Sequence, residues 1–252
     1  MKIVVTGGAG VVGSKVVEIL AAQGHKVTAA SQRTGVNVIT GEGLDDALVG
    51  AEVVVDVVNS PTFDDATAMR FFETSSRNIL TSAAATGVRH YVGLSIVGSE
   101  RLSQNGYFRA KLVQEGLIKD GGVPFTIVRS TQFFEFLDAV VDSAADGETV
   151  RLSPARVQFV AAQDVASALA DIAVRAPTNE TVEVAGPDPF RLDEMTRLYL
   201  AARGDGRRVV TDPQALYFGT ILNDETLISG TIPRFGHTEF DSWLRQRTAR
   251  AA

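Results

Sequence analysis

Hydrophobic and polar positions fall into short alternating blocks over the first 130 residues of the chain. Nearly continuous apolar runs, such as residues 51–58, are typical of strands that are buried on both faces of a sheet. Apolar positions spaced three and four residues apart, as over residues 14–20, predict helices. Glycine and proline separate the blocks. This alternation with short connections predicts an α/β protein in which helices wrap a parallel sheet.

The same pattern gives the expected bounds of each element. We expect strands at residues 3–5, 25–30, 36–39, 51–58, 90–95 and 125–128, and helices at 14–20, 44–48, 65–85 and 107–118. After residue 129 the alternation weakens to helices at 133–145, 164–174 and 192–202 and strands at 157–160 and 181–184. We therefore expect a ligand-binding core over residues 1–130 and a smaller C-terminal lobe over residues 131–252 that covers the substrate, the two interleaved in one structural domain.

The most informative segment, VVTGGAGVVG, lies between the first predicted strand and the first predicted helix. Its G-x-x-G-x-x-G spacing predicts a site for a dinucleotide. We expect Gly7 to permit a tight turn, Gly10 to let the backbone approach a pyrophosphate, and Gly13 to allow close helix packing. The helix N-terminus at Val11 and Val12 would then offer free N–H groups to the phosphates. An ordinary glycine turn is the alternative.

The residues after the second predicted strand indicate which cofactor is preferred. NAD-binding units carry a carboxylate there, about 20 residues beyond the glycines, for the adenosine ribose. This chain has Ser31, Gln32 and Arg33 in that place. A guanidinium pairs with a phosphate in bidentate geometry, so we expect NADP(H) in preference to NAD(H). A solvated surface arginine is the alternative.

Candidate catalytic residues occur at a strand end and in the helix that follows. Tyr107 and Lys111 are four residues apart, which places them on one face of a helix. A nearby ammonium favours a phenolate, so we expect a lowered pKa for Tyr107 and a role for it as proton donor in carbonyl reduction. Ser95, at the end of the preceding strand, is a candidate donor to the substrate oxygen. The alternative is an amphipathic helix with a half-buried tyrosine and a solvated lysine.

Composition narrows the function further. The 252-residue chain has a net charge of −6, which disfavours nucleic acid as a partner, and its three scattered histidines lack the spacing of a metal site. It has no cysteine, which excludes disulfides and thiol catalysis. No apolar run is long enough for a membrane span, and Met1-Lys2 leads directly into the first strand without a signal peptide. We expect a soluble cytoplasmic protein, a monomer or a homodimer, that binds a small-molecule substrate and no metal.

Together, TGGAGVVG, the strand that ends at Ser95 and the Tyr107-x-x-x-Lys111 pair resemble the short-chain dehydrogenase/reductase superfamily. More narrowly, TSAAATGVRHYVGLS, YFRAKLVQE and PFTIVRSTQFFEF resemble its atypical NmrA-like and isoflavone-reductase-like members. The resemblance implies a Rossmann fold, a doubly wound parallel sheet with helices on both faces. It also implies Tyr107 as acid/base, Lys111 as its ribose-binding partner, and Ser95 as donor to the substrate oxygen.

The resemblance extends to residues around the cofactor. It implies that the segment of Asn59 and Ser60 lines the cofactor and that Ser130 and Thr131 pass near the nicotinamide. The chain departs from the pattern at two positions. Many extended members have a proline where this chain has Ser130, and an asparagine where it has Phe72.

Aromatic residues cluster shortly after the last strong strand signal. Phe133 and Phe134 are candidates for the wall of an apolar substrate pocket. A stripe of phenylalanine that packs in the core is the alternative.

We expect an NADPH-dependent oxidoreductase that reduces a small, largely apolar carbonyl, quinone or enone. The first alternative is an NADP(H)-binding redox sensor or regulator without turnover, because the atypical branch that the chain resembles includes such regulators. The second is a sugar-nucleotide epimerase or dehydratase, which the small C-terminal lobe disfavours.

Overall fold

The computed structural model describes residues 1–230 and 232–251, which form two compact units. The first unit holds Met1–Arg129 and Val165–Val182, and the second holds Ser130–Asp164 and the residues from Glu183 onward. The chain thus passes from the first unit to the second, returns, and ends in the second. Every site residue predicted before Ser130 belongs to the first unit.

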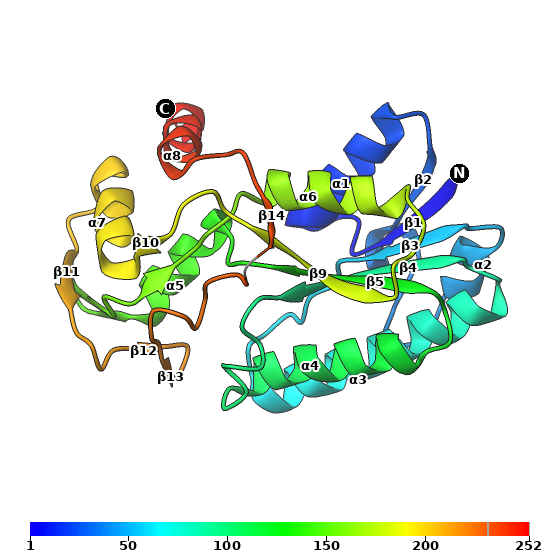
Figure 1. Ribbon diagram of the computed structural model, residues 1–252, viewed down its shortest axis with the longest axis horizontal. Coiled ribbons are helices and arrows are strands. Elements are labelled where there is room, and N and C mark those ends of the chain that lie inside the picture. Colours follow the sequence, from blue (N-terminus) through cyan, green and yellow to red (C-terminus); the bar gives the residue numbers. More distant parts are fainter. Residues whose placement is uncertain (231, 252) are drawn as a thin grey trace. The chain divides into compact units, whose positions relative to one another are not determined.

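A seven-stranded sheet is the framework of the fold (Figure 1). Strand β1 runs parallel to both of its neighbours, with Thr6 opposite Ala30 on one side and Asp56 on the other. The carboxyl ends of these three strands therefore lie side by side, where open α/β sheets bind their ligands. The strand order is β14 (Arg234–Phe235), β9 (Glu180–Ala185), β5 (Phe125–Ser130), β4 (His90–Ile96), β3 (Val53–Asp56), β1 (Lys2–Thr6) and β2 (Lys26–Ala30).

Helices cover both faces of this sheet, so the predicted doubly wound fold is confirmed (Figure 1). Helices α3 (Asp65–Ala85) and α4 (Gly106–Asp120) pack against each other on one face. Helices α1 (Val11–Ala22) and α6 (Ala162–Ala173) lie on the other face, and the short α2 (Leu44–Leu48) contacts α3. In the described part of the chain no helix combines the length and the apolarity needed to cross a lipid bilayer.

The strand predicted at residues 36–39 is wrong. The Asn37 side-chain oxygen accepts the backbone N–H groups of Ile39 at 2.9 Å and Thr40 at 3.3 Å, which closes a turn in place of a strand. Val36 is nevertheless buried in the core beside Val54. The apolar residues of this segment therefore reflect packing in the core and not pairing with a neighbouring strand.

Short strands and helices make up the second unit. Its helices are α5 (Leu137–Ser143), α7 (Leu192–Ala202) and α8 (Phe240–Ala251), and its shortest helical turn is η2 (Phe134–Phe136). Its strands pair as β6 (Ala145–Asp146) with β7 (Thr149–Leu152), β7 with β11 (Arg208–Thr211), β8 (Arg156–Val157) with β10 (Phe190–Arg191), and β12 (Leu216–Tyr217) with β13 (Thr220–Ile221). The helix predicted at 133–145 is thus split into η2 and α5, and the strand predicted at 157–160 is reduced to β8.

Candidate active site

The glycine loop between β1 and α1 is tightly packed. Gly7 has a φ of +76°, a left-handed conformation that favours glycine. A side chain at Gly13 would place its Cβ 2.2 Å from the carbonyl oxygen of Gly7, so only glycine lets the helix approach the loop this closely. The N–H of Gly10 donates to the same carbonyl oxygen at 2.9 Å. The loop is therefore built around backbone contacts that larger residues would disrupt.

The N-terminus of α1 fits the pyrophosphate of a dinucleotide. The helix is preceded by Gly10, whose position provides no side-chain cap, and its first turn contains no acidic residue. The first N–H groups of a helix lack partners within the helix and attract anions. Val11, in this first turn, is 51% exposed. The glycine cradle and the uncapped helix together suit a bound NAD(P)H.

Arg33 lies in the turn η1 (Gln32–Thr34), directly beyond the carboxyl end of β2. The hydroxyl of Thr34 fixes this turn, because it accepts from the Ser31 N–H and donates to the Ala29 carbonyl, both at 2.9 Å. Arg33 is exposed, and its guanidinium makes no hydrogen bond or ion pair with the side chains and backbone that the structure describes. It is available to an anionic ligand at this edge of the sheet.

Tyr107 lies in a largely aromatic environment near the start of α4. Its hydroxyl donates to the side-chain oxygen Oδ1 of Asn59 at 2.7 Å, and only 8% of the residue is exposed. The rings of Phe63, Phe72 and Phe108 have centroids 5.0, 5.7 and 5.7 Å from that of Tyr107. Burial raises the pKa of Tyr107 well above its ordinary value, although the hydrogen bond to Asn59 opposes the shift. The expected lowering of this pKa by a neighbouring ammonium is therefore wrong for this structure.

Lys111 is buried and its ammonium has partners other than the phenol. The ammonium donates to the Leu94 carbonyl at 2.8 Å and to the side-chain oxygen of Gln114, and it lies 4.5 Å from the centroid of the Phe72 ring. Burial lowers the pKa of Lys111 to about 8, against the opposing charge of Asp56. Lys111 is thus a largely protonated, internal cation at neutral pH.

Asp56, which sequence reasoning missed, organises the polar interior around this cation. Its Oδ1 accepts from the Thr6 hydroxyl at 2.8 Å, and its Oδ2 accepts from the Tyr91 hydroxyl at 2.6 Å and from Gln114 at 3.1 Å. Gln114 in turn accepts from Lys111, so it connects the carboxylate to the ammonium. The signal in the sequence was a carboxylate flanked on both sides by valines within the apolar run of residues 51–58.

Ser95 is engaged elsewhere in the interior. Its hydroxyl donates to Glu115 at 2.6 Å, and only 2% of the residue is exposed. Glu115 also accepts two hydrogen bonds of 2.8 Å from the Arg129 guanidinium. Burial alone would raise the pKa of Glu115, but the hydrogen bonds from Arg129 and Ser95 outweigh it and leave the pKa below its ordinary value. The hydroxyl of Ser95 is therefore bonded to an ionised carboxylate.

The remaining predicted residues divide between the two units. Ser60, in the first unit, is buried and its hydroxyl accepts from the Thr62 N–H at 3.4 Å. Ser130 and Thr131 are buried in the second unit, where the Thr131 hydroxyl accepts from the Gly186 N–H at 3.3 Å. Three of the residues predicted to line the cofactor are therefore buried in this structure.

The two candidate pocket phenylalanines differ in exposure. Phe134 is 1% exposed and packs against Phe240 and Trp243, with ring centroids 5.5 and 5.2 Å away. Phe133 is 9% exposed and stacks on the more exposed Phe136. Phe134 therefore packs in the core, which is the alternative given above for these phenylalanines.

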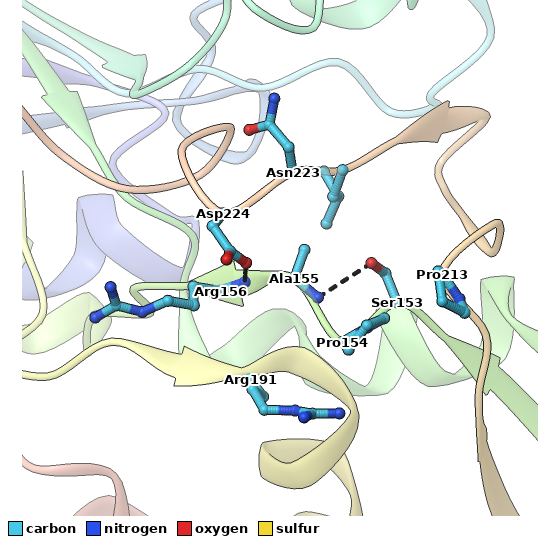
Figure 2. Close-up of a pocket in the computed structure, with 9 residues that line it drawn as sticks. Ser153, Pro154, Ala155, Arg156, Arg191, Pro213, Asn223 and Asp224 are labelled. Carbon is cyan, nitrogen blue, oxygen red and sulfur yellow. Dashed lines mark hydrogen bonds between the residues drawn. The ribbon is translucent and has the colours of Figure 1, made fainter.

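A cavity of about 520 Å³ lies within the second unit (Figure 2). Its lining includes the positively charged Arg156 and Arg191 and the negatively charged Asp224. Figure 2 shows Asp224 against the backbone of Arg156, whose N–H donates to the carboxylate at 2.9 Å. The other lining residues are Ser153, Pro154, Ala155, Pro213, Leu222 and Asn223. Neither of the two candidate pocket phenylalanines lines this cavity.

Comparison with known proteins agrees with this geometry. Residues 7–176 match the model of a family described as NAD(P)H-binding. The chain is 31% identical over 212 residues to the (4-alkanoyl-5-oxo-2,5-dihydrofuran-3-yl)methyl phosphate reductase of Streptomyces griseus, with 77% of this chain and 71% of the relative covered. It is 28% identical over 151 residues to the photosystem II assembly factor Ycf39 of Cyanophora paradoxa, with 54% of this chain and 47% of that protein covered.

A solved structure supports the fold. A short-chain dehydrogenase/reductase superfamily protein from Agrobacterium tumefaciens, with bound NAD, superimposes with a TM-score of 0.74 at 19% identity. The match covers 100% of this chain and 97% of that one. The resemblance stated from the sequence is thus confirmed. The chain belongs to the family described as NAD(P)H-binding and is an enzyme of the NAD(P)H-dependent reductase type.

Proposed function

We propose that this protein reduces a small, largely apolar carbonyl, quinone or enone, with NADPH as the hydride donor and Tyr107 as the proton donor. One observation carries the proposal: Tyr107 has a protonated phenol that is fixed by Asn59, and its ring centroid lies 5.0 Å from that of Phe63. Phe63 is 49% exposed, so an apolar surface next to the Tyr107 ring is open to solvent. An exposed ring beside a fixed phenol favours a substrate with an apolar body and a polar oxygen.

The chemistry divides between the cofactor and the chain. Bound NADPH supplies a hydride to the substrate carbon. The oxygen of the same carbonyl gains the proton of Tyr107, which recovers a proton from water after the reaction. Burial holds the pKa of Tyr107 above its ordinary value, so the phenol carries its proton at neutral pH.

The residues that hold the cofactor follow from the same proposal. Phosphates would bind at the uncapped end of α1, and the adenosine 2′-phosphate would pair with Arg33. Two of the three N–H groups of Lys111 bind Gln114 and the Leu94 carbonyl, and the third would bind a ribose hydroxyl. Ser95 would reach the substrate only by leaving Glu115.

The Streptomyces relative supports a carbonyl-bearing substrate, because its name describes a reductase of an alkanoyl oxo-dihydrofuran that also carries a methyl phosphate group. The test is NADPH consumption by the purified protein against a panel of quinones, aldehydes, ketones and enones, with NADH run in parallel. Turnover of at least one compound, faster with NADPH, is the expected result. Saturable NADPH binding without turnover on any compound contradicts it.

That second result would favour a cofactor-binding protein that acts through a partner. The observation behind this candidate is the relative named as an assembly factor. Comparable affinity for NADPH and NADP⁺, measured by calorimetry together with the panel, would support it.

A further inference from the structure

The loop after β3 brings an amide to the phenol of Tyr107. Asn59 lies three residues beyond the end of β3 and 48 positions before Tyr107 in the chain, and its Oδ1 accepts the phenolic hydrogen bond at 2.7 Å. The same loop touches the glycine loop, because a Cβ on Gly7 would lie 2.9 Å from the backbone of Val57. Asn59 therefore links the candidate proton donor to the region that suits the cofactor.

An amide bonded in this way has unused donors. Oδ1, which accepts from the phenol, and Nδ2 are bonded to the same carbon. Nδ2 therefore has two N–H groups that remain available next to the phenol oxygen. Asn59 is exposed, and its Nδ2 makes no hydrogen bond to any residue within 1–230 or 232–251. These N–H groups are thus available to a ligand oxygen that also approaches Tyr107.

Ser95 does not have an available hydrogen-bond donor in this structure. Its hydroxyl proton is directed to Glu115, whose carboxylate is held by Arg129. Release of that proton to a substrate would leave the buried carboxylate short of a hydrogen bond, which is costly. The exposed amide of Asn59 requires no such exchange.

We propose that Asn59 is the second hydrogen-bond donor of the reaction: it orients the Tyr107 hydroxyl and binds, through Nδ2, the substrate oxygen that Tyr107 protonates. This inference rests on the proposed reductase function. As the hydride adds to the carbonyl carbon, the π electron pair moves to the oxygen, which Nδ2–H stabilises. The Tyr107 hydroxyl then turns from Asn59 Oδ1 to this oxygen and transfers its proton to it. The hydrogen bond strengthens as negative charge develops, so it lowers the barrier and not only the ground state.

Three variants test it: Asn59→Ala, Asn59→Asp and Ser95→Ala, each assayed with the best substrate of the panel. Asn59→Asp keeps an acceptor for the phenol but loses both donors. We expect either Asn59 variant to lower kcat about 100-fold, as removal of an oxyanion donor does, with the NADPH dissociation constant within about threefold of wild type. We expect Ser95→Ala to lower kcat by less than either. A large loss in Ser95→Ala with near-normal Asn59 variants overturns the proposal.

Two further measurements separate this inference from the proposed function. Asn78→Ala is the matched control, because it removes an amide that bonds only the Val38 and Ile39 carbonyls among the described partners. A double-mutant cycle of Asn59→Ala and Tyr107→Phe, measured by urea unfolding, needs no substrate. We expect the double variant to lose less stability than the sum of the two single variants, because both single variants remove the same hydrogen bond. Additive losses overturn the Asn59–Tyr107 pairing even where turnover is absent, whereas coupled losses without turnover overturn the reductase function alone.

Discussion

The ammonium of Lys111 lies 4.5 Å from the centre of the Phe72 ring, within range of a cation–π interaction. The same ring packs edge-on against Tyr107, with centroids 5.7 Å apart. Phe72 therefore touches both members of the Tyr-x-x-x-Lys pair, and each polar end finds its own partner, Asn59 for the phenol and Gln114 for the ammonium. The pair shares a helix but belongs to two separate hydrogen-bond networks.

Because Lys111 is buried, the free energy of unfolding should change with pH in the alkaline range. Its pKa is about 8 in the folded protein, below its ordinary value of 10.5, so the unfolded chain binds more protons between these values. Stability therefore rises with pH across this window, by on the order of 3 kcal/mol if the whole shift is realised. Urea unfolding from about pH 7 to about pH 9.5 should show this rise in wild type and lose it in Lys111→Met. Lys26→Met, at an exposed position, is the control, and an equal slope in Lys111→Met contradicts the account.

Glu115 makes the free energy of unfolding depend on pH in the acidic range, with the same sign as Lys111, because stability again rises with pH. Its folded pKa is depressed, so its contribution is present above the unfolded value and is lost as pH falls through the folded one. Glu115→Gln should cost about 2 to 4 kcal/mol at neutral pH, because it removes the buried one of the two carboxylates that pair with Arg129. The cost should shrink as the pH falls through the folded pKa of Glu115, where wild type loses the same pair. Glu73→Gln breaks only an exposed pair and should cost less than about 0.5 kcal/mol.

Arg33 should determine the choice between the two nicotinamide cofactors. Arg33→Gln removes a cation that is free to pair with the 2′-phosphate, and we expect NADPH to bind about 30-fold more weakly, equivalent to about 2 kcal/mol. NADH, which lacks that phosphate, should change little. Fluorescence titration of both cofactors measures this, and Arg77→Gln, at an exposed helix position, is the control. Equal weakening of NADH and NADPH would refute the assignment.

The glycine loop should tolerate no side chain at Gly13. The added Cβ of Gly13→Ala meets the Gly7 carbonyl oxygen at 2.2 Å, and we expect a loss of at least about 2 kcal/mol in unfolding free energy together with loss of NADPH binding. Gly116→Ala is the matched control in α4, where a Cβ meets nothing within 4 Å. It should stabilise the protein by about 0.5 to 1 kcal/mol. A Gly13→Ala variant as stable as wild type contradicts the packing described.

The sequence predicted elements best where local signals were strong. Residues 44–48 and 65–85 were predicted to the residue, because polar or glycine punctuation brackets each helix. The segment 36–39 misled because hydrophobicity alone does not reveal that Asn37 closes a turn there. The backbone hydrogen bonds of this segment depend on the Asn37 side chain, and the pattern of apolar positions gives no information about that side chain.

The candidate site shows the same limit. The spacing of Tyr107 and Lys111 identified two residues of the site, but not their partners. Asn59 comes from a loop 48 positions away and Asp56 from a neighbouring strand, so neither follows from the helix pattern. Folding, and not helical spacing, determines which side chains face each other.

The most direct test of the central claim is kcat of Tyr107→Phe against wild type with NADPH and the best substrate of the panel. We predict a fall of about 100-fold or more, since the variant removes the proton donor, with the NADPH dissociation constant nearly unchanged. Tyr199→Phe, which removes a hydroxyl bonded to Asp138, should retain near-normal turnover. A Tyr107→Phe variant that turns over within about threefold of wild type would show that Tyr107 is not the acid.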